Sequence, residues 1–127
     1  MGKLVAPRSH IDRRDLAVSA SVTNTNPAEL ADDAVILDVR RQDEWDAGHA
    51  PTAIHIPIEE LPDRAGELPA TGTPIPVVCR GGGRSARAAK WLNENGHSAI
   101  NVAGGMKAWH EAGKPMESSG ESYPAVK

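Results

Sequence analysis

Short apolar runs alternate with more polar stretches along most of the chain. The runs are rich in β-branched residues and show little polar alternation, which is typical of strands buried on both faces of a parallel sheet. Strands are therefore predicted at residues 34–39, 53–57, 75–78 and 98–102.

Helices are predicted in the stretches between these runs. Asn26 and Pro27 form a helix start, because asparagine caps an N-terminus and proline suits the first helical position. Asn95, Gly96 and Gly113 are typical helix stops. Further predicted helices lie at residues 43–47, 59–66, 84–95 and 106–112. This alternation predicts an α/β fold, a three-layer α/β/α arrangement around a parallel sheet of about five strands.

The two ends of the chain differ from its middle. Residues 1–20 carry mixed charges and are expected to form a flexible N-terminal arm, with one short strand over residues 16–22. Residues 117–127 are polar and are expected to form a flexible C-terminal tail. Residues 21–116 remain as one domain, and a chain of 127 residues is long enough to bury a core.

The strand at residues 75–78 delivers the chain's single cysteine, Cys79, to a turn with three consecutive glycines. Glycines let neighbouring backbone N–H groups converge on one point, and the helix that follows adds free N–H groups and the positive end of its dipole. Such a concavity lowers the pKa of a thiol, and the thiolate is the nucleophile. The loop is therefore predicted to activate Cys79 as the catalytic residue and to bind the anion that it attacks. The predicted binding residues are Arg80, Gly81, Gly82, Gly83, Arg84 and Ser85.

Other interpretations of nearby residues are less specific. A lone cysteine after an apolar strand is usually a small buried hydrophobe, but the glycines and arginines beside Cys79 fit that interpretation poorly. Asp38 and Arg40 follow a strand at the sheet edge where α/β folds bind ligands. For both, a structural role such as an ion pair is favoured over a catalytic one, although Arg40 could also approach the anion. Gly104 and Gly105 are predicted to pack closely beside the loop.

The segment CRGGGRS at residues 79–85 resembles the active-site loop of the rhodanese (sulfurtransferase) family. Three further motifs resemble family signatures: ILDVR with DEW and GHAP in residues 36–51, AIHIP at 53–57, and VAGGMKAW at 102–109. The resemblance implies the rhodanese fold. It also implies that Cys79 takes the outer sulfur of a donor such as thiosulfate and becomes a persulfide. The loop amides from Arg80 to Ser85 would hold that sulfur until a nucleophilic acceptor removes it.

The loop is compatible with three functions. Related phosphatases and arsenate reductases place five residues between cysteine and arginine, whereas four residues, 80–83, lie between Cys79 and Arg84. The smaller loop suits one sulfur atom, so an enzyme of the thiosulfate:cyanide sulfurtransferase type is favoured. A sulfur carrier or regulatory module that passes sulfur to one partner protein is the alternative. Phosphatase or arsenate reductase activity is the least favoured.

Composition and charge limit the classes of partner that are expected for this protein. A formal charge of −3 argues against nucleic-acid binding, and five histidines without ligand spacing give no expected metal site. One cysteine excludes an internal disulfide and leaves no resolving thiol, so sulfur on Cys79 must leave to another molecule. The expected partners are a small anionic sulfur donor and a thiol or cyanide acceptor, or an acceptor protein, with no cofactor. A cytoplasmic location is expected, because the free thiol is reactive and no signal peptide is apparent. No membrane partner is expected, because no apolar run reaches the length needed to span a bilayer.

Overall fold

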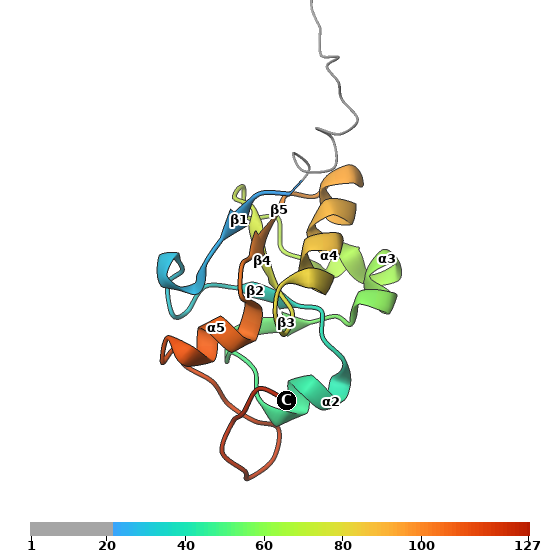
Figure 1. The fold of residues 1–127 in the computed structure, drawn as a ribbon. Helices are drawn as coiled ribbons and strands as arrows, with labels where there is room; N and C mark the ends of the chain where they lie inside the picture. The colour runs from blue at the N-terminus through green and yellow to red at the C-terminus, as the bar shows by residue number, and fades with distance from the viewer. Residues whose placement is uncertain (1–21) are drawn as a thin grey trace, which may run out of the picture.

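The computed structural model describes residues 22–127. The arm predicted for residues 1–20 and most of the strand predicted over residues 16–22 lie outside this range. Five parallel strands form one sheet in the order β1-β5-β4-β2-β3 (Figure 1). Their bounds are β1 Asn24–Thr25, β2 Ile36–Asp38, β3 Ala53–His55, β4 Ile75–Val78 and β5 Ala99–Val102.

The α-helices are α2 Gln42–Ala47, α3 Leu61–Arg64, α4 Gly83–Glu94 and α5 Gly105–Glu111, with 3-10 turns at Pro27–Glu29, Ile58–Glu60 and Ala65–Glu67. Asn26 caps the first 3-10 turn, and its side chain accepts a hydrogen bond from the Ala28 N–H at 3.0 Å. The short helix predicted at 59–66 is present in part: α3 covers its middle, and a 3-10 turn flanks α3 on each side. Pro62 has no N–H to donate and Gly66 disfavours helix, which accounts for the interruption. Within residues 22–127, no helix has both the length and the apolar character needed to cross a bilayer.

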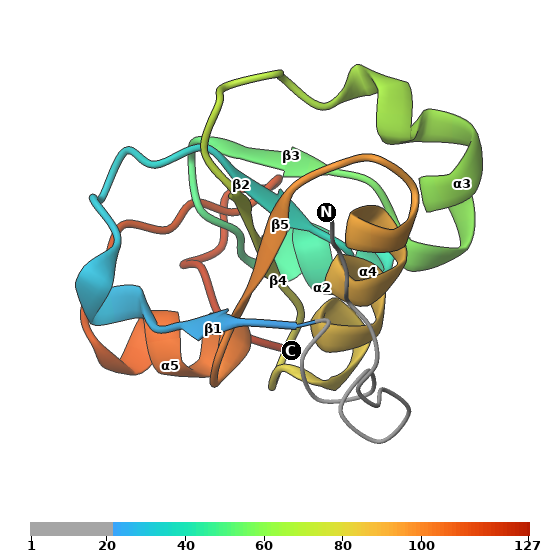
Figure 2. The same ribbon diagram turned by 90° about the horizontal axis from the view of Figure 1, so that it is seen from above.

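Helices cover both faces of the sheet (Figure 2). On one face, α3 and α4 pack on the strands through a core that includes Leu37, Val77 and Leu92. On the other face, α5 packs through a core that includes Val78 and Trp109. The predicted three-layer α/β/α fold with a five-stranded parallel sheet is therefore confirmed.

The start of α5 contacts the loop that follows β4. The Met106 N–H donates to the Cys79 carbonyl at 2.8 Å, and the Lys107 N–H donates to the Arg80 carbonyl at 3.0 Å. Gly105 has φ +55°, and a Cβ on it would lie 2.6 Å from the Arg80 carbonyl oxygen. Glycine is required there by space as well as by backbone conformation, so the predicted close packing beside the loop is confirmed.

The C-terminal segment lies along α2. Glu117 and His49 exchange two backbone hydrogen bonds of 2.8 Å, and the Ala125 N–H donates to the Ala47 carbonyl at 2.9 Å. The Lys127 ammonium lies 2.9 Å from an Asp43 carboxylate oxygen. The flexibility of residues 117–127 stays a prediction. To move freely, the segment would have to break these contacts with residues 43–49.

Gly105→Ala should destabilise the protein much more than Gly113→Ala. Both glycines have positive φ, but among residues 22–127 nothing lies within 4 Å of a Cβ built on Gly113. Gly113→Ala, the control, should lower the free energy of unfolding by about 1 kcal/mol because of backbone strain alone. Gly105→Ala should lose about 3 kcal/mol or more, because the added methyl also displaces backbone. Denaturant unfolding measures both values, and equal losses would contradict the close approach.

Candidate active site

Strand β4 places Cys79 at the carboxyl edge of the sheet, where the chain turns into α4. Cys79 is 1% exposed. The turn ends at Gly82, whose φ of +118° favours glycine and which precedes the first residue of α4. The 12-residue α4 therefore directs its free N-terminal amides toward the region of the thiol.

Hydrogen-bond donors surround the sulfur. The Gly82 N–H donates to Cys79 Sγ at 3.0 Å, and the Ser85 hydroxyl donates to it at 3.3 Å. Burial alone would raise the pKa of the thiol, but the Ser85 hydroxyl and the backbone amides of Ser85, Gly82 and Gly81 outweigh it. The pKa of Cys79 is lowered as a result. This environment favours the thiolate, which is the nucleophilic form of cysteine.

Helix α5 fixes the orientation of the loop peptides. In a trans peptide the carbonyl and the next N–H point to opposite sides. The Arg80 carbonyl accepts the Lys107 N–H, and the Gly81 N–H of the same peptide acts on the Cys79 sulfur. The contact with α5 on one side of the loop thus directs an amide toward the sulfur on the other.

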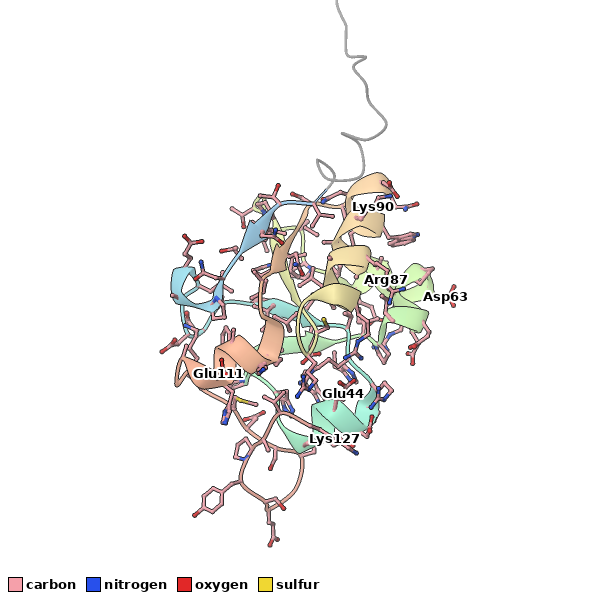
Figure 3. The ribbon with its side chains drawn as sticks, viewed as in Figure 1. Glu44, Asp63, Arg87, Lys90, Glu111 and Lys127 are labelled. Atoms are coloured by element: carbon pink, nitrogen blue, oxygen red, sulfur yellow. The ribbon has the colours of Figure 1, made fainter. Side chains whose placement is uncertain are left out.

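Arg84 is held by a carboxylate that the sequence analysis did not identify. Its Nη1 and Nη2 donate to the two oxygens of Glu44 at 2.7 and 2.9 Å, and Figure 3 shows Glu44 on α2 near the start of α4. The Glu44 side chain is 3% exposed. The hydrogen bond from Arg84 is the main reason that the pKa of Glu44 falls to about 2. The Arg84 charge is therefore compensated, and its predicted role in donor binding stays a prediction.

The other two arginines near the loop lie on the surface. Arg80 is exposed, and its Nε donates to the Lys127 carbonyl at 3.2 Å. Arg87 is exposed on α4, on the side that faces α3 (Figure 3). Of the predicted loop residues, the structure brings Gly81, Gly82 and Ser85 to the sulfur.

Asp38 and Arg40 form a buried ion pair beside this site, since Asp38 is the register partner of Val78 at the end of β4. The Arg40 Nε and Nη2 donate to the Asp38 carboxylate at 2.9 and 2.7 Å, and neither side chain is exposed. Arg40 Nη2 also donates to the Gly48 carbonyl at 2.7 Å. The pair thus connects the end of β2 to the end of α2, the helix that carries Glu44.

His49 and His55, two of the five histidines that lack ligand spacing, both contact Trp45. The His49 and His55 rings stack on its indole with centroid distances of 3.7 and 4.6 Å. A ring nitrogen of His49 lies 2.7 Å from the Trp45 carbonyl, and one of His55 lies 2.8 Å from the Arg40 carbonyl. These contacts hold α2 against the end of β3.

Asn101 is a second residue of the site that sequence inspection missed. The Ser85 hydroxyl lies 2.6 Å from Asn101 Oδ1, and Asn101 Nδ2 donates to Asn24 Oδ1 at 2.9 Å. Asn101 is 5% exposed. A polar residue inside the apolar strand 99–102 was the available signal, because a buried amide needs hydrogen-bond partners.

Comparison with known proteins agrees with this geometry. The profile of the family described as "Rhodanese-like domain" matches residues 25–112. The chain is 33% identical over 90 residues to a "Sulfurtransferase" of Allochromatium vinosum, covering 68% of this chain and 83% of that protein. A rhodanese-like domain protein from Staphylococcus aureus has a similar structure, with a TM-score of 0.66, 33% identity, and coverage of 76% of this chain and 100% of that one. Thiosulfate sulfurtransferase from Pseudomonas aeruginosa gives a TM-score of 0.70 at 26% identity, over 86% of this chain and 23% of that one. The resemblance in the sequence is confirmed: the chain belongs to the family of rhodanese-like domains.

Proposed function

We propose that this protein is a sulfurtransferase that moves a sulfane sulfur from thiosulfate or a persulfide donor to cyanide or a thiol. The family and a relative named sulfurtransferase support sulfur transfer in general. One observation carries the mechanism: Cys79 Sγ accepts hydrogen bonds from the Gly82 N–H at 3.0 Å and the Ser85 hydroxyl at 3.3 Å. A sulfur held in this way is ready to react as a thiolate.

The first step loads the cysteine. The Cys79 thiolate attacks the outer sulfur of thiosulfate, and a new S–S bond forms. The S–S bond of thiosulfate breaks, and sulfite leaves with the electron pair. The negative charge then lies on the terminal sulfur of the persulfide, where preorganised loop N–H groups stabilise it without reorganisation.

The second step unloads it. The carbon of cyanide attacks the terminal sulfur, a C–S bond forms, and the persulfide S–S bond breaks. Thiocyanate leaves and the Cys79 thiolate is restored. A general base is unnecessary in both steps because the nucleophile is already ionised. The compact turn between Cys79 and Arg84, with four intervening residues, supports the transfer of one atom over that of a phosphoryl group.

Cys79→Ser should abolish thiocyanate formation from thiosulfate and cyanide. The serine hydroxyl keeps the size of the side chain but is not ionised at neutral pH and cannot form a persulfide. The assay should run beside intact-mass spectrometry, in which the wild type gains one sulfur atom and the variant gains none. Full activity in the variant would refute the mechanism. A wild type that gains the sulfur but forms almost no thiocyanate would instead indicate a sulfur carrier.

Glu44→Gln should strengthen the binding of an anionic donor. The substitution keeps an oxygen that can accept the Arg41 N–H but removes the charge that compensates Arg84. The KM for thiosulfate should fall about fivefold, which corresponds to about one charge-assisted hydrogen bond regained by the donor.

The matched control is Glu60→Gln, which removes the same charge from an exposed pair with Arg64. That variant should leave the KM for thiosulfate unchanged. An unchanged or higher KM in Glu44→Gln would show that the Arg84 charge does not take part in donor binding.

A further inference from the structure

The Ser85 hydroxyl stands between two acceptors. It lies 3.3 Å from Cys79 Sγ and 2.6 Å from Asn101 Oδ1, and Ser85 is fully buried. A hydroxyl carries one hydrogen, so it can donate to only one of the two acceptors at a time. The Ser85 hydroxyl therefore stabilises negative charge on the Cys79 sulfur only when its hydrogen points to that sulfur and not to Asn101.

The chain of hydrogen bonds continues to the edge of the sheet. Asn101 Nδ2 donates to Asn24 Oδ1 at 2.9 Å, and these two residues are register partners in β5 and β1. Asn101 is buried, whereas Asn24 is exposed. A side-chain amide exchanges its donor and acceptor ends by a half-turn of its terminal group, so both amides can reverse without any movement of the backbone.

The hydrogen-bond chain can run in either direction, and in both directions each of its side chains has a donor or acceptor partner. In one direction the Ser85 hydroxyl donates to Asn101 and Asn101 donates to Asn24, which leaves the Ser85 oxygen free to accept the hydrogen of a neutral thiol. In the reversed direction Asn24 donates to Asn101, Asn101 donates to the Ser85 oxygen, and the hydroxyl donates to a thiolate. Buried polar groups are retained where they are satisfied, and here both charge states of the sulfur meet that condition.

We propose that Asn24 and Asn101 form a reversible amide relay, in which their orientation determines whether the Ser85 hydroxyl stabilises the Cys79 sulfur. Both act as positioning residues, since neither contacts the sulfur itself. The proposal rests on the proposed function only in taking Cys79 as the nucleophile. During a transfer cycle the relay would point toward the sulfur in the free thiolate and away from it once the charge has moved to the outer sulfur.

Charged groups also face this site and act separately from the relay. Arg84 on α4 interacts electrostatically with Cys79 and with Asp38 on β2. Glu44 on α2 compensates Arg84, and Arg40 compensates Asp38. Relay variants at Asn24 leave all four of these side chains in place.

The test is Asn24→Asp, measured as the rate of Cys79 alkylation by iodoacetamide against pH. An ionised aspartate only accepts, so it fixes Asn101 with Nδ2 toward residue 24 and Oδ1 toward Ser85. The hydroxyl is then kept from the sulfur, and the midpoint of the alkylation profile should rise by about one pH unit, the effect of one hydrogen bond to a charged group. In Asn101→Asp the new carboxylate itself accepts the hydrogen bond of the Ser85 hydroxyl, so the midpoint should rise at least as much.

The matched control is Thr23→Asp, which places the same charge one residue away, where the side chain points to the other face of the strand. Solvent and salt screen an exposed charge at this edge, so the midpoint should barely move. In a Ser85→Ala background, Asn24→Asp should lose its effect, because the hydroxyl that the relay directs is gone. Thermal unfolding of each variant checks that the fold is retained.

Equal midpoints for Asn24→Asp and Thr23→Asp would overturn the proposal, as would a shift that persists without the Ser85 hydroxyl. Alkylation needs no sulfur donor, so this test is independent of sulfur transfer. A relay shift in a protein without sulfurtransferase activity would uphold the relay and reject the proposed function. Normal sulfurtransferase activity without a shift of the alkylation midpoint would uphold the proposed function and reject the relay.

Discussion

Two hydrogen bonds between α5 and the loop after β4 fix the geometry on which the site depends. The N–H groups of Met106 and Lys107 donate to the carbonyls of Cys79 and Arg80 at 2.8 and 3.0 Å. Because peptide groups are planar, fixing these carbonyls on one side directs the following amides to the other. The bonds form only because Gly105 lets the helix approach the loop backbone. A glycine far along the sequence thus shapes the surroundings of the cysteine.

The charge balance of the site follows from a second constraint. Arg84 is the arginine that closes the loop, but Glu44 binds both of its terminal nitrogens. Neutral donors, namely amides and the Ser85 hydroxyl, therefore contribute most to stabilising the sulfur. Helix α2 can present Glu44 because the buried Asp38–Arg40 pair and the stacked histidines hold it at the carboxyl edge of the sheet. The ion pair therefore supports α2, the helix whose Glu44 compensates the charge of Arg84.

Local sequence patterns predicted the sheet and the loop because their signals are contiguous. Apolar β-branched runs predicted strands near β2, β3, β4 and β5, and the glycine-rich turn after Cys79 predicted converging amides. Glu44 and Asn101, which reach the site through tertiary contacts, were missed. Glu44 meets Arg84 across 40 residues of sequence and Asn101 meets Asn24 across 77. Neither pairing has a local pattern, since each depends on how strands and helices are ordered in space. The short edge strand β1 was not predicted for a similar reason, because its two residues pair with β5 without a periodic pattern of their own.

The central claim is that backbone amides and one hydroxyl overcome the effect of burial and keep Cys79 ionised at lower pH than a free thiol. The most direct measurement is a pH titration of the thiolate by its ultraviolet absorbance, with the signal of Cys79→Ser subtracted to remove the contribution of Tyr123. The chain has one cysteine, so the difference reports this residue alone. We expect a midpoint below the ordinary value of 9.0. A midpoint at or above that value would show that burial prevails and would contradict the account.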